Sequence, residues 1–331
     1  MSDALPSYAE LLQRDDAPAG SAWGLFGADD DRGAVNLVSP DCVVEAARCV
    51  RRGVAFNLDY PLDAFPGPLR HRHRLQHHMH FLGARDDGSW GATDEPAGMV
   101  DDYLDGFYPQ ASSQLDGLRH VAHGVHGFYN RFPAARAIAA GDPGLGVNRW
   151  AERPLVARGV LVDVAGYRED LGRPLDHPAG EPIGVRLLEE TLQHQKTTLL
   201  PGDALVLRTG YREFWTANRD DDAATSRMAG LEQTREVVAW LWDRRIPLVG
   251  CDNLAVEAVP PSPSCDLGDG PDGSLHVHLI ALLGMVLGEL WKLDELAADC
   301  AADGRYDFML VSKPLNLVGG AGSPANATAV K

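Results

Sequence analysis

Short apolar runs alternate with amphipathic segments through the second half of this 331-residue chain, and this order constrains the fold more than any other feature. Residues 159–164, 203–208 and 307–311 are apolar runs of the kind that form buried strands. Residues 185–192 and 237–242 carry apolar side chains at helical spacing. Alternation of strand and helix is typical of a partly parallel sheet covered by helices. The sequence therefore predicts an α/β fold with a mixed sheet.

The first half of the chain is less regular. Residues 54–60 predict a strand, whereas residues 61–105 are rich in Gly, Asp and His and predict long loops with short strands. The sequence contains no internal repeat and no obvious linker. We therefore expect one domain over residues 1–331, in which residues 1–21 form an N-terminal arm.

Charge and cysteine content limit the partners and the compartment. The formal net charge of −17 argues against nucleic acid and against anionic membrane surfaces as partners. The chain shows neither a signal-peptide pattern nor an apolar stretch of membrane-spanning length. Its five cysteines include no Cys-x-x-Cys pair, which fits reduced thiols better than a disulfide framework. We expect a cytoplasmic protein that acts on a small molecule.

The segment Gln-Ala-Ser-Ser-Gln-Leu-Asp-Gly-Leu-Arg-His, residues 110–120, holds the main candidate site residues. In an extended chain, side chains two apart share a face, so Gln110, Gln114, Asp116 and His120 would line one cleft together. A carboxylate, an imidazole and two amides in one cleft suit acid–base chemistry. The alternative interpretation is that Asp116 caps a turn and that His120 is a satisfied core histidine.

This segment resembles a motif of the cyclase family of hydrolases, which includes kynurenine formamidase and isatin hydrolase. Many members carry His-x-Gly-Thr-His-x-Asp-x-Pro-x-His there. Compared with that pattern, this chain keeps Asp116 and His120 but has Gln110 and Gln114 in place of the first two histidines. Further similarity extends over most of the chain from about Ala22 onward.

The resemblance implies two more site residues in the C-terminal half, a histidine and a glutamate. We identify them as His276 and Glu289, with His278 as the second choice for the histidine. Without the family, the two histidines could be a helix surface or a structural pair, and Glu289 could precede a helix near Leu293. The resemblance also implies a swivelling β/β/α arrangement and a homodimer or higher homo-oligomer, with loops of one subunit near the other's pocket.

A divalent metal, such as manganese or zinc, is the cofactor that the resemblance implies. In family members the two motif histidines and the aspartate bind a metal, and the last histidine transfers protons. An amide oxygen binds zinc or manganese far more weakly than an imidazole, so the two glutamines should cripple that first site. A second set of ligands, Asp116, His276 and Glu289, remains, with His120 as general acid or base.

A metal-free site is the alternative. In that case Gln110 or Gln114 would donate a hydrogen bond to a carbonyl or a developing oxyanion. Asp116 would orient His120, which would act as the base.

Three further residues are candidate substrate contacts. Arg208 ends a predicted strand, where α/β proteins often place ligand-contacting groups, although a salt bridge at the strand end would explain it equally well. The segment from His71 to His80 has five histidines among its residues, which suits a solvated cationic loop. The alternative is that an Arg or His of this segment contacts a substrate carboxylate or carbonyl, and His80 is the residue we select as the candidate. Trp23 opens the N-terminal signature of the family branch.

The resemblance, together with these residues, implies a hydrolase that cleaves an amide, lactam or lactone bond of a small cyclic or aromatic metabolite. A metal-free cyclase or lyase that acts on a polyketide-like biosynthetic intermediate is the alternative enzyme. A ligand-binding protein that has lost catalysis is a third possibility. Metal content would separate the two enzymes, and His120→Ala would separate both from the binding protein.

Overall fold

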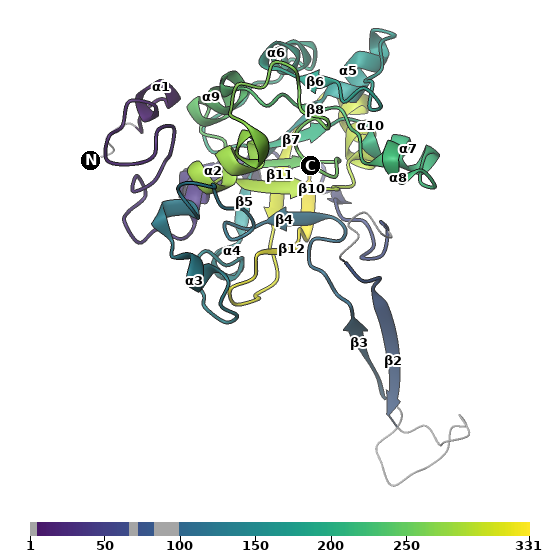
Figure 1. Cartoon of the computed structure of the whole chain (residues 1–331). Coiled ribbons are helices and arrows are strands. Elements are labelled where there is room, and N and C mark those ends of the chain that lie inside the picture. The colour runs from purple at the N-terminus through teal and green to yellow at the C-terminus, as the bar shows by residue number, and fades with distance from the viewer. Residues whose placement is uncertain (1–4, 66–71, 83–98) are drawn as a thin grey trace.

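The computed structural model describes residues 5–65, 72–82 and 99–331, and one mixed sheet lies at its centre (Figure 1). In this described part the sheet has nine strands. In spatial order they are β1 (Ala55–Asn57), β13 (Ala327–Val330), β11 (Asp307–Ser312), β5 (Leu155–Asp163), β7 (Ala204–Arg208), β9 (Leu248–Cys251), β10 (Val286–Glu289), β4 (Gln114–Asp116) and β12 (Gly322–Pro324). The predicted α/β fold with a mixed sheet is therefore confirmed.

The strands differ in direction between the middle and the two sides of the sheet. β5, β7, β9 and β10 are parallel to one another. β11, β13 and β1 on one side, and β4 and β12 on the other, each pair antiparallel. The parallel strands are buried on both faces, which explains why their sequences are continuous apolar runs.

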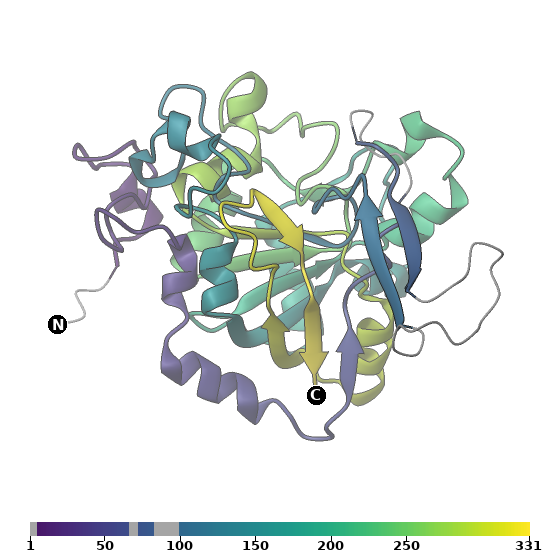
Figure 2. The same cartoon turned by 90° about the horizontal axis from the view of Figure 1, so that it is seen from below.

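Helices flank this sheet and connect its parallel strands (Figure 2). The longer helices are α2 (Pro40–Arg48), α6 (Val185–His194), α9 (Arg235–Asp243) and α10 (Asp294–Asp303). The shorter ones are α1 (Tyr8–Leu11), α3 (Ala134–Ala137), α4 (Asn148–Glu152), α5 (Val164–Asp170), α7 (Tyr211–Ala217) and α8 (Asp222–Thr225). The helices expected over residues 185–192 and 237–242 are α6 and α9.

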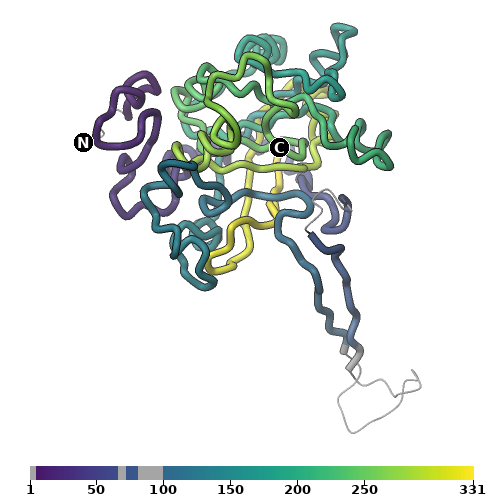
Figure 3. The backbone as a smooth tube through the Cα atoms, in the orientation of Figure 1, coloured from purple at the N-terminus to yellow at the C-terminus, as the bar shows by residue number. Residues whose placement is uncertain are grey.

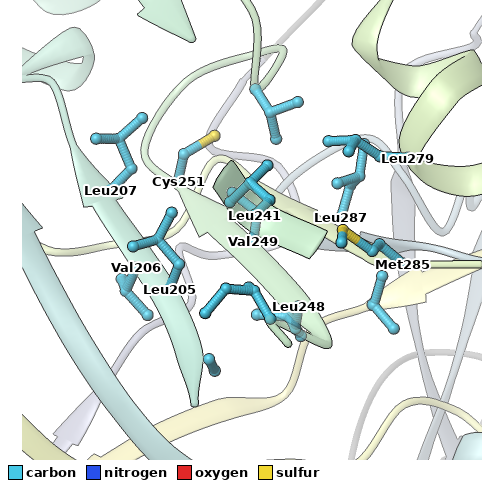
Figure 4. Packing of buried hydrophobic residues seen from close by; sticks show 14 of the residues in the cluster. Leu205, Val206, Leu207, Leu241, Leu248, Val249, Cys251, Leu279, Met285 and Leu287 are labelled. Carbon is cyan, nitrogen blue, oxygen red and sulfur yellow. The ribbon is translucent and has the colours of Figure 1, made fainter. Parts of the chain in front are cut away.

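The main hydrophobic core packs against the parallel strands (Figure 4). Leu205 and Leu207 of β7 and Val249 of β9 are fully buried there. Trp291 is also fully buried, and its indole Nε1 donates to the backbone oxygen of Gln114 at 3.0 Å. The core therefore holds the short strand β4, which carries candidate site residues, in a fixed position.

A two-stranded hairpin projects from the body as an arm (Figures 1 and 3). It consists of β2 (Gln76–Leu82) and β3 (Met99–Asp105), paired antiparallel along seven residues each. Short strands were expected among long loops over residues 61–105, and these two strands lie there, each seven residues long. Residues 66–71 and 83–98, which belong to the same expectation, lie outside the described residues.

The N-terminal segment packs on the body of the protein. Tyr8 and Leu11 of α1 are buried, and Trp242 Nε1 of α9 donates to the backbone oxygen of Pro6 at 2.9 Å. In the parts of the chain that the structure describes, we find no helix with the length and apolarity needed to cross a membrane.

Candidate active site

The pairing of β4 with β10 brings the two halves of the proposed site together. In this antiparallel pair Gln114 lies opposite Glu289, and Asp116 lies opposite Leu287. β4 has only three residues, and the chain then turns, with His120 N donating to Gly117 O at 2.9 Å. The prediction of one extended face from Gln110 to His120 was therefore wrong outside β4. The turn nevertheless brings the His120 side chain close to Asp116, with Nε2 of His120 3.8 Å from Oδ1 of Asp116.

Asp116 is the centre of the site and is fully buried. Its Oδ1 accepts a hydrogen bond from Gln110 Nε2 and lies 3.8 Å from His120 Nε2. Its Oδ2 lies 3.6 Å from His276 Nε2. Burial raises the pKa of this carboxyl, but the charges of His120 and His276 and the bond from Gln110 outweigh burial and lower it. Asp116 is therefore an ionised carboxylate in a dry environment.

His120 lies on the open side of the site. Its side chain is 31% exposed, whereas the side chain of Asp116 is inaccessible to solvent. Its Nδ1 lies 3.0 Å from Gln110 Nε2, so one amide nitrogen faces both the imidazole and the carboxylate. An exposed imidazole beside a buried carboxylate can exchange protons with a bound small molecule.

His276 lies on the inner side, where the chain enters the π-helical turn Val277–Leu282. Its Nε2 is 3.0 Å from Glu289 Oε1, and its Nδ1 is 2.9 Å from Glu257 Oε2. Burial lowers the pKa of this imidazole, but Glu257, Asp116 and Glu289 together raise it well above its usual range. His278, the second choice, lies elsewhere, with its Nε2 near the backbone oxygens of Leu267 and Asp272.

Glu289 completes the site from the end of β10. Its Oε2 accepts a hydrogen bond from Gln114 Nε2 at 2.5 Å, and its Oε1 accepts one from Val256 N at 3.2 Å. Burial and the neighbouring charge of Asp116 raise its pKa to about 7, although His276 opposes this shift. We call Asp116, His120, His276 and Glu289 the acid–histidine cluster.

The cluster has a donor set that could hold a divalent metal ion. Ligand atoms of Asp116, His120 and His276 all lie within 4.8 Å of one another. Asp116 Oδ2 and Gln114 Oε1 are buried and have no hydrogen-bond partner among the described residues. Buried oxygens without partners are costly unless something else satisfies them. Imidazole and carboxylate donors with such an oxygen therefore fit manganese or zinc.

Two residues of the site escaped the sequence analysis. Glu257 contacts His276, but it lies in an irregular segment that matches no motif considered there. Arg72 lies in the histidine-rich segment, and its Nη1 donates to the backbone oxygen of Gln110. The cationic character of that segment was a signal, but the sequence could not show which of its side chains reaches the site.

The three candidate substrate contacts lie apart from the cluster. The Arg208 guanidinium forms ion pairs with Asp163, Glu213 and Asp294. His80 is exposed on β2 of the arm. Trp23 is buried, and its Nε1 donates to the backbone oxygen of Ala281 at 2.7 Å. Among the described residues, none of the three forms a hydrogen bond or an ion pair with the cluster. His71, at the start of the histidine-rich segment, lies outside the described residues.

Comparisons with known proteins identify the family to which this chain is similar. The model of the Cyclase family, described as "Putative cyclase", matches residues 71–258. A solved structure described as a novel cyclase is 36% identical in sequence, with a TM-score of 0.80, and the match covers 94% of this chain and 99% of that one. No curated protein matches the sequence.

More distant solved structures share the fold. Isatin hydrolase A from Labrenzia aggregata, bound to benzyl benzoate, has a TM-score of 0.53 at 15% identity, over 86% of this chain and 94% of that one. Isatin hydrolase A from Ralstonia solanacearum has a TM-score of 0.53 at 16% identity, over 88% of this chain and 97% of that one. At such low identity these matches show the fold alone. The match to the family model and the 36% identity to a solved cyclase show that this chain belongs to the cyclase family.

Proposed function

We propose that this chain is a hydrolase that cleaves an amide, lactam or lactone bond of a small cyclic or aromatic metabolite. The observation that carries the proposal is the solvent-accessible His120 beside the buried carboxylate of Asp116, with Oδ1 of Asp116 3.8 Å from His120 Nε2. Two distant members of the same fold are isatin hydrolases, which supports hydrolysis as the reaction class.

In the proposed reaction His120 carries the proton. It takes a proton from water as the water oxygen bonds to the substrate carbonyl carbon. It then returns the proton to the leaving nitrogen or oxygen as the C–N or C–O bond breaks. Asp116 stabilises the imidazolium that forms between these two steps. The amide donors of Gln110 and Gln114 face carboxylates, so we assign them to holding Asp116 and Glu289 in place rather than to polarising the carbonyl.

Asp116, His276 and Glu289 would hold a divalent ion in this site, which leaves His120 free for proton transfer. When bound, such an ion supplies Lewis acidity toward a carbonyl or a water molecule. Because the pKa of His276 is raised, binding through Nε2 requires this imidazole to lose a proton. Glu257 can retain the Nδ1 proton in a hydrogen bond, which leaves Nε2 directed at the other ligands.

The test is hydrolysis of a panel of lactams, aryl formamides and lactones by the purified chain with added Mn²⁺ or Zn²⁺. We expect His120→Ala to lower kcat/KM on the best substrate by about 10²–10⁴-fold. The matched control is His194→Ala, which removes a half-exposed histidine that pairs with Asp170 on the surface. Equal activity of the His120 variant and wild type would overturn the proposal.

A metal-free cyclase or lyase is the second candidate. It is favoured by the hydrogen bond from Gln110 Nε2 to Asp116 Oδ1, which gives a buried carboxylate a partner without a metal. Such an enzyme would use His120 as a base for enolisation. Chelator-treated protein that keeps full activity on a cyclisable substrate, with no hydrolysis of the panel, would support this candidate and contradict the first.

We also propose that the chain forms a homodimer through the arm. An isolated two-stranded hairpin is marginally stable in water, and this one exposes Met79 at 64%, Val100 at 59% and Tyr103 at 54%. Light scattering should give the mass of a dimer for wild type. A Met79→Ser, Tyr103→Ser variant should shift the mass toward the monomer, and a monomeric wild type would contradict the proposal.

A further inference from the structure

The turn that carries His120, residues 117–120, is held by buried contacts. Gly117 N donates to Ala321 O at 2.8 Å, and His120 N donates to Gly117 O at 2.9 Å. Between these two residues, Leu118 is fully buried and the side chain of Arg119 is only 2% exposed. The solvent-accessible imidazole of His120 therefore extends from a turn that is itself buried.

Arg119 is an arginine whose guanidinium donates mainly to backbone carbonyls. Its Nε donates to Gly144 O and its Nη2 donates to Asp142 O, both at 2.6 Å. Its Nη1 donates at 3.1–3.3 Å to the backbone oxygens of three further residues, Ala137, Ala139 and Gly319. A guanidinium carries five N–H donors in a rigid fork, so five carbonyls around it fix its position and its orientation.

These carbonyls belong to two segments that are remote from Arg119 in the sequence. Four of them lie in residues 137–144, at the end of α3 and after it, and the fifth belongs to Gly319 near the C-terminus. Gly319 has a φ of +72°, and a Cβ at this position would lie 2.4 Å from Asp142 O and 2.9 Å from Arg119 Nη1. Glycine at position 319 therefore leaves the room that the guanidinium and its carbonyl partners occupy.

The His120 imidazole has few contacts of its own that would hold it in place. Among the described residues its one hydrogen-bond contact is with Gln110, whose Nε2 lies 3.0 Å from Nδ1. Its Nε2 lies 3.8 Å from Asp116 Oδ1, which is beyond hydrogen-bond distance. A small movement of the turn would therefore change how the imidazole meets Asp116, and a misplacement of about 1 Å can cost on the order of 10²-fold in rate.

We infer that Arg119 is a positioning residue that fixes the turn so that the His120 imidazole stays beside Asp116. The guanidinium is directed at residues 137–144 and Gly319, so Arg119 acts through the backbone of the turn. The inference rests on the proposed function in that His120 is taken to transfer the proton. A side chain that is open to solvent keeps a defined place in a site only if its supporting residues are themselves fixed.

The first test compares Arg119→Lys with Arg136→Lys in the hydrolase assay. Lysine keeps the charge but lacks the planar fork that reaches the five carbonyls. We expect Arg119→Lys to lower kcat by roughly 10–100-fold and to leave KM within about threefold. Arg136 is the matched control, because it also pairs with Asp142 and lies over the Phe132 ring, but its side chain is 53% exposed. Normal kcat in Arg119→Lys, or an equal loss in both variants, would overturn the inference.

The second test needs no substrate. NMR signals of the His120 imidazole, assigned by comparison with His120→Ala, are recorded on the full histidine-labelled chain with and without chelator. We expect these signals to shift or broaden in Arg119→Lys and to remain as in wild type in Arg136→Lys. Unchanged His120 signals in a folded Arg119→Lys protein would also overturn the inference, because Arg119 would then contribute to stability alone.

Gly319→Ala disturbs the same contacts without changing Arg119, and it decides the question if Arg119→Lys fails to fold. Its control is Gly172→Ala, since Gly172 has a φ of +66° and a Cβ there would meet no described atom within 4 Å. Both variants therefore strain the backbone, but only the first displaces the guanidinium. The His120 signals should change in Gly319→Ala and not in Gly172→Ala, and the same spectrum for both would contradict the inference.

These outcomes are distinct from a failure of the proposed function. If the chain hydrolyses nothing in the panel, yet the His120 signals change in Arg119→Lys and Gly319→Ala, the positioning role stands and the reaction does not. If hydrolysis requires His120 but the signals and kcat are indifferent to both changes, the reaction stands and the positioning role does not.

Discussion

Two regions of the same sheet hold buried charges: the end of β7, and the place where β4 pairs with β10. They differ in how many of their buried charged and polar atoms have a hydrogen-bond or ion-pair partner. At β7, Arg208 pairs with three carboxylates at 3.1–3.2 Å. The buried Asp252 accepts from Thr209 N and Gly210 N, both at 2.8 Å. At β4, Asp116 Oδ2 and Gln114 Oε1 are buried without a hydrogen-bond partner among the described residues.

This difference separates a structural network from a candidate site. In a saturated network every donor and acceptor already has a partner, so a ligand would have to displace one. In the acid–histidine cluster the unsatisfied oxygens and the carboxyl with a pKa near neutrality are available to a metal, a proton or a substrate. Arg208 and Arg72 differ in a similar way: Arg208 forms ion pairs with three carboxylates, whereas Arg72 forms none with a residue that the structure describes.

The largest expected effect is on turnover when the central carboxylate loses its charge. Asp116→Asn should lower kcat/KM by about 10²–10⁴-fold, because the imidazolium of His120 loses its counter-charge and the metal loses a ligand. Thermal unfolding should show a folded protein with a modest loss of stability, because a carboxyl whose pKa is lowered on folding stabilises the folded state. A variant with near-normal activity would show that the reaction takes place elsewhere. The cluster at β4 and β10 would then be a structural network, as the charges at the end of β7 are.

At the end of β7 the main effect should be on stability. Arg208→Ala leaves the buried Asp163 without its cation, and we expect the free energy of unfolding to fall by about 2 kcal/mol, since Glu213 and Asp294 are more exposed and lose less. Activity per folded molecule should stay within about threefold. A large loss of turnover with unchanged denaturant stability would show that Arg208 takes part in the site after all.

Replacing Glu257, whose carboxylate contacts Nδ1 of His276, should weaken metal binding. Glu257→Gln should lower the affinity for Mn²⁺ or Zn²⁺ by roughly 10–100-fold, because the neutral amide no longer orients the imidazole or raises its basicity. Calorimetric titration of the chelator-treated protein measures this affinity independently of activity. Glu232→Gln, outside the cluster, is the control. An unchanged affinity would mean that the metal, if bound, does not use His276.

The last expected effect is a dependence of stability on pH. Burial raises the pKa of both Glu289 and Asp59 to about 7. A carboxyl whose pKa is raised on folding stabilises the protein fully below its unfolded pKa, and this contribution is lost as the pH rises toward the folded pKa. Metal-free wild type should therefore lose stability between about pH 4.5 and 7, the two pKa values of Glu289.

The free energy of unfolding, measured across this pH range, distinguishes the contribution of Glu289 from that of Asp59. Glu289→Gln should remove one part of the pH dependence, and Asp59→Asn should remove the other. Added Mn²⁺ near pH 7.5 should stabilise wild type and Asp59→Asn but have little effect on Glu289→Gln. Equal stabilisation of all three proteins would show that Glu289 is not a ligand.

The sequence predicted the parts of the fold that depend on local pattern. Apolar runs and helical spacing identified β5, β7, β11, α6 and α9, because buried strands and amphipathic helices each leave a short-range periodicity. The sequence predicted short strands within residues 61–105 but not their pairing into a projecting hairpin, because β2 and β3 are rich in polar residues and show no clear alternation. The extended face from Gln110 to His120 was also wrong, because a turn after β4 depends on contacts with other segments.

The residue types and the family motif alone determined that Asp116, His120, His276 and Glu289 were the candidates for chemistry. Only the tertiary structure decided that His276 rather than His278 enters the cluster and that Glu257 contacts it. It also decided that Arg208 forms ion pairs with three carboxylates, whereas Arg72 forms none with a described residue. The reason is physical: side-chain chemistry is encoded residue by residue, whereas partnership and burial arise from strand pairing between segments far apart in the chain.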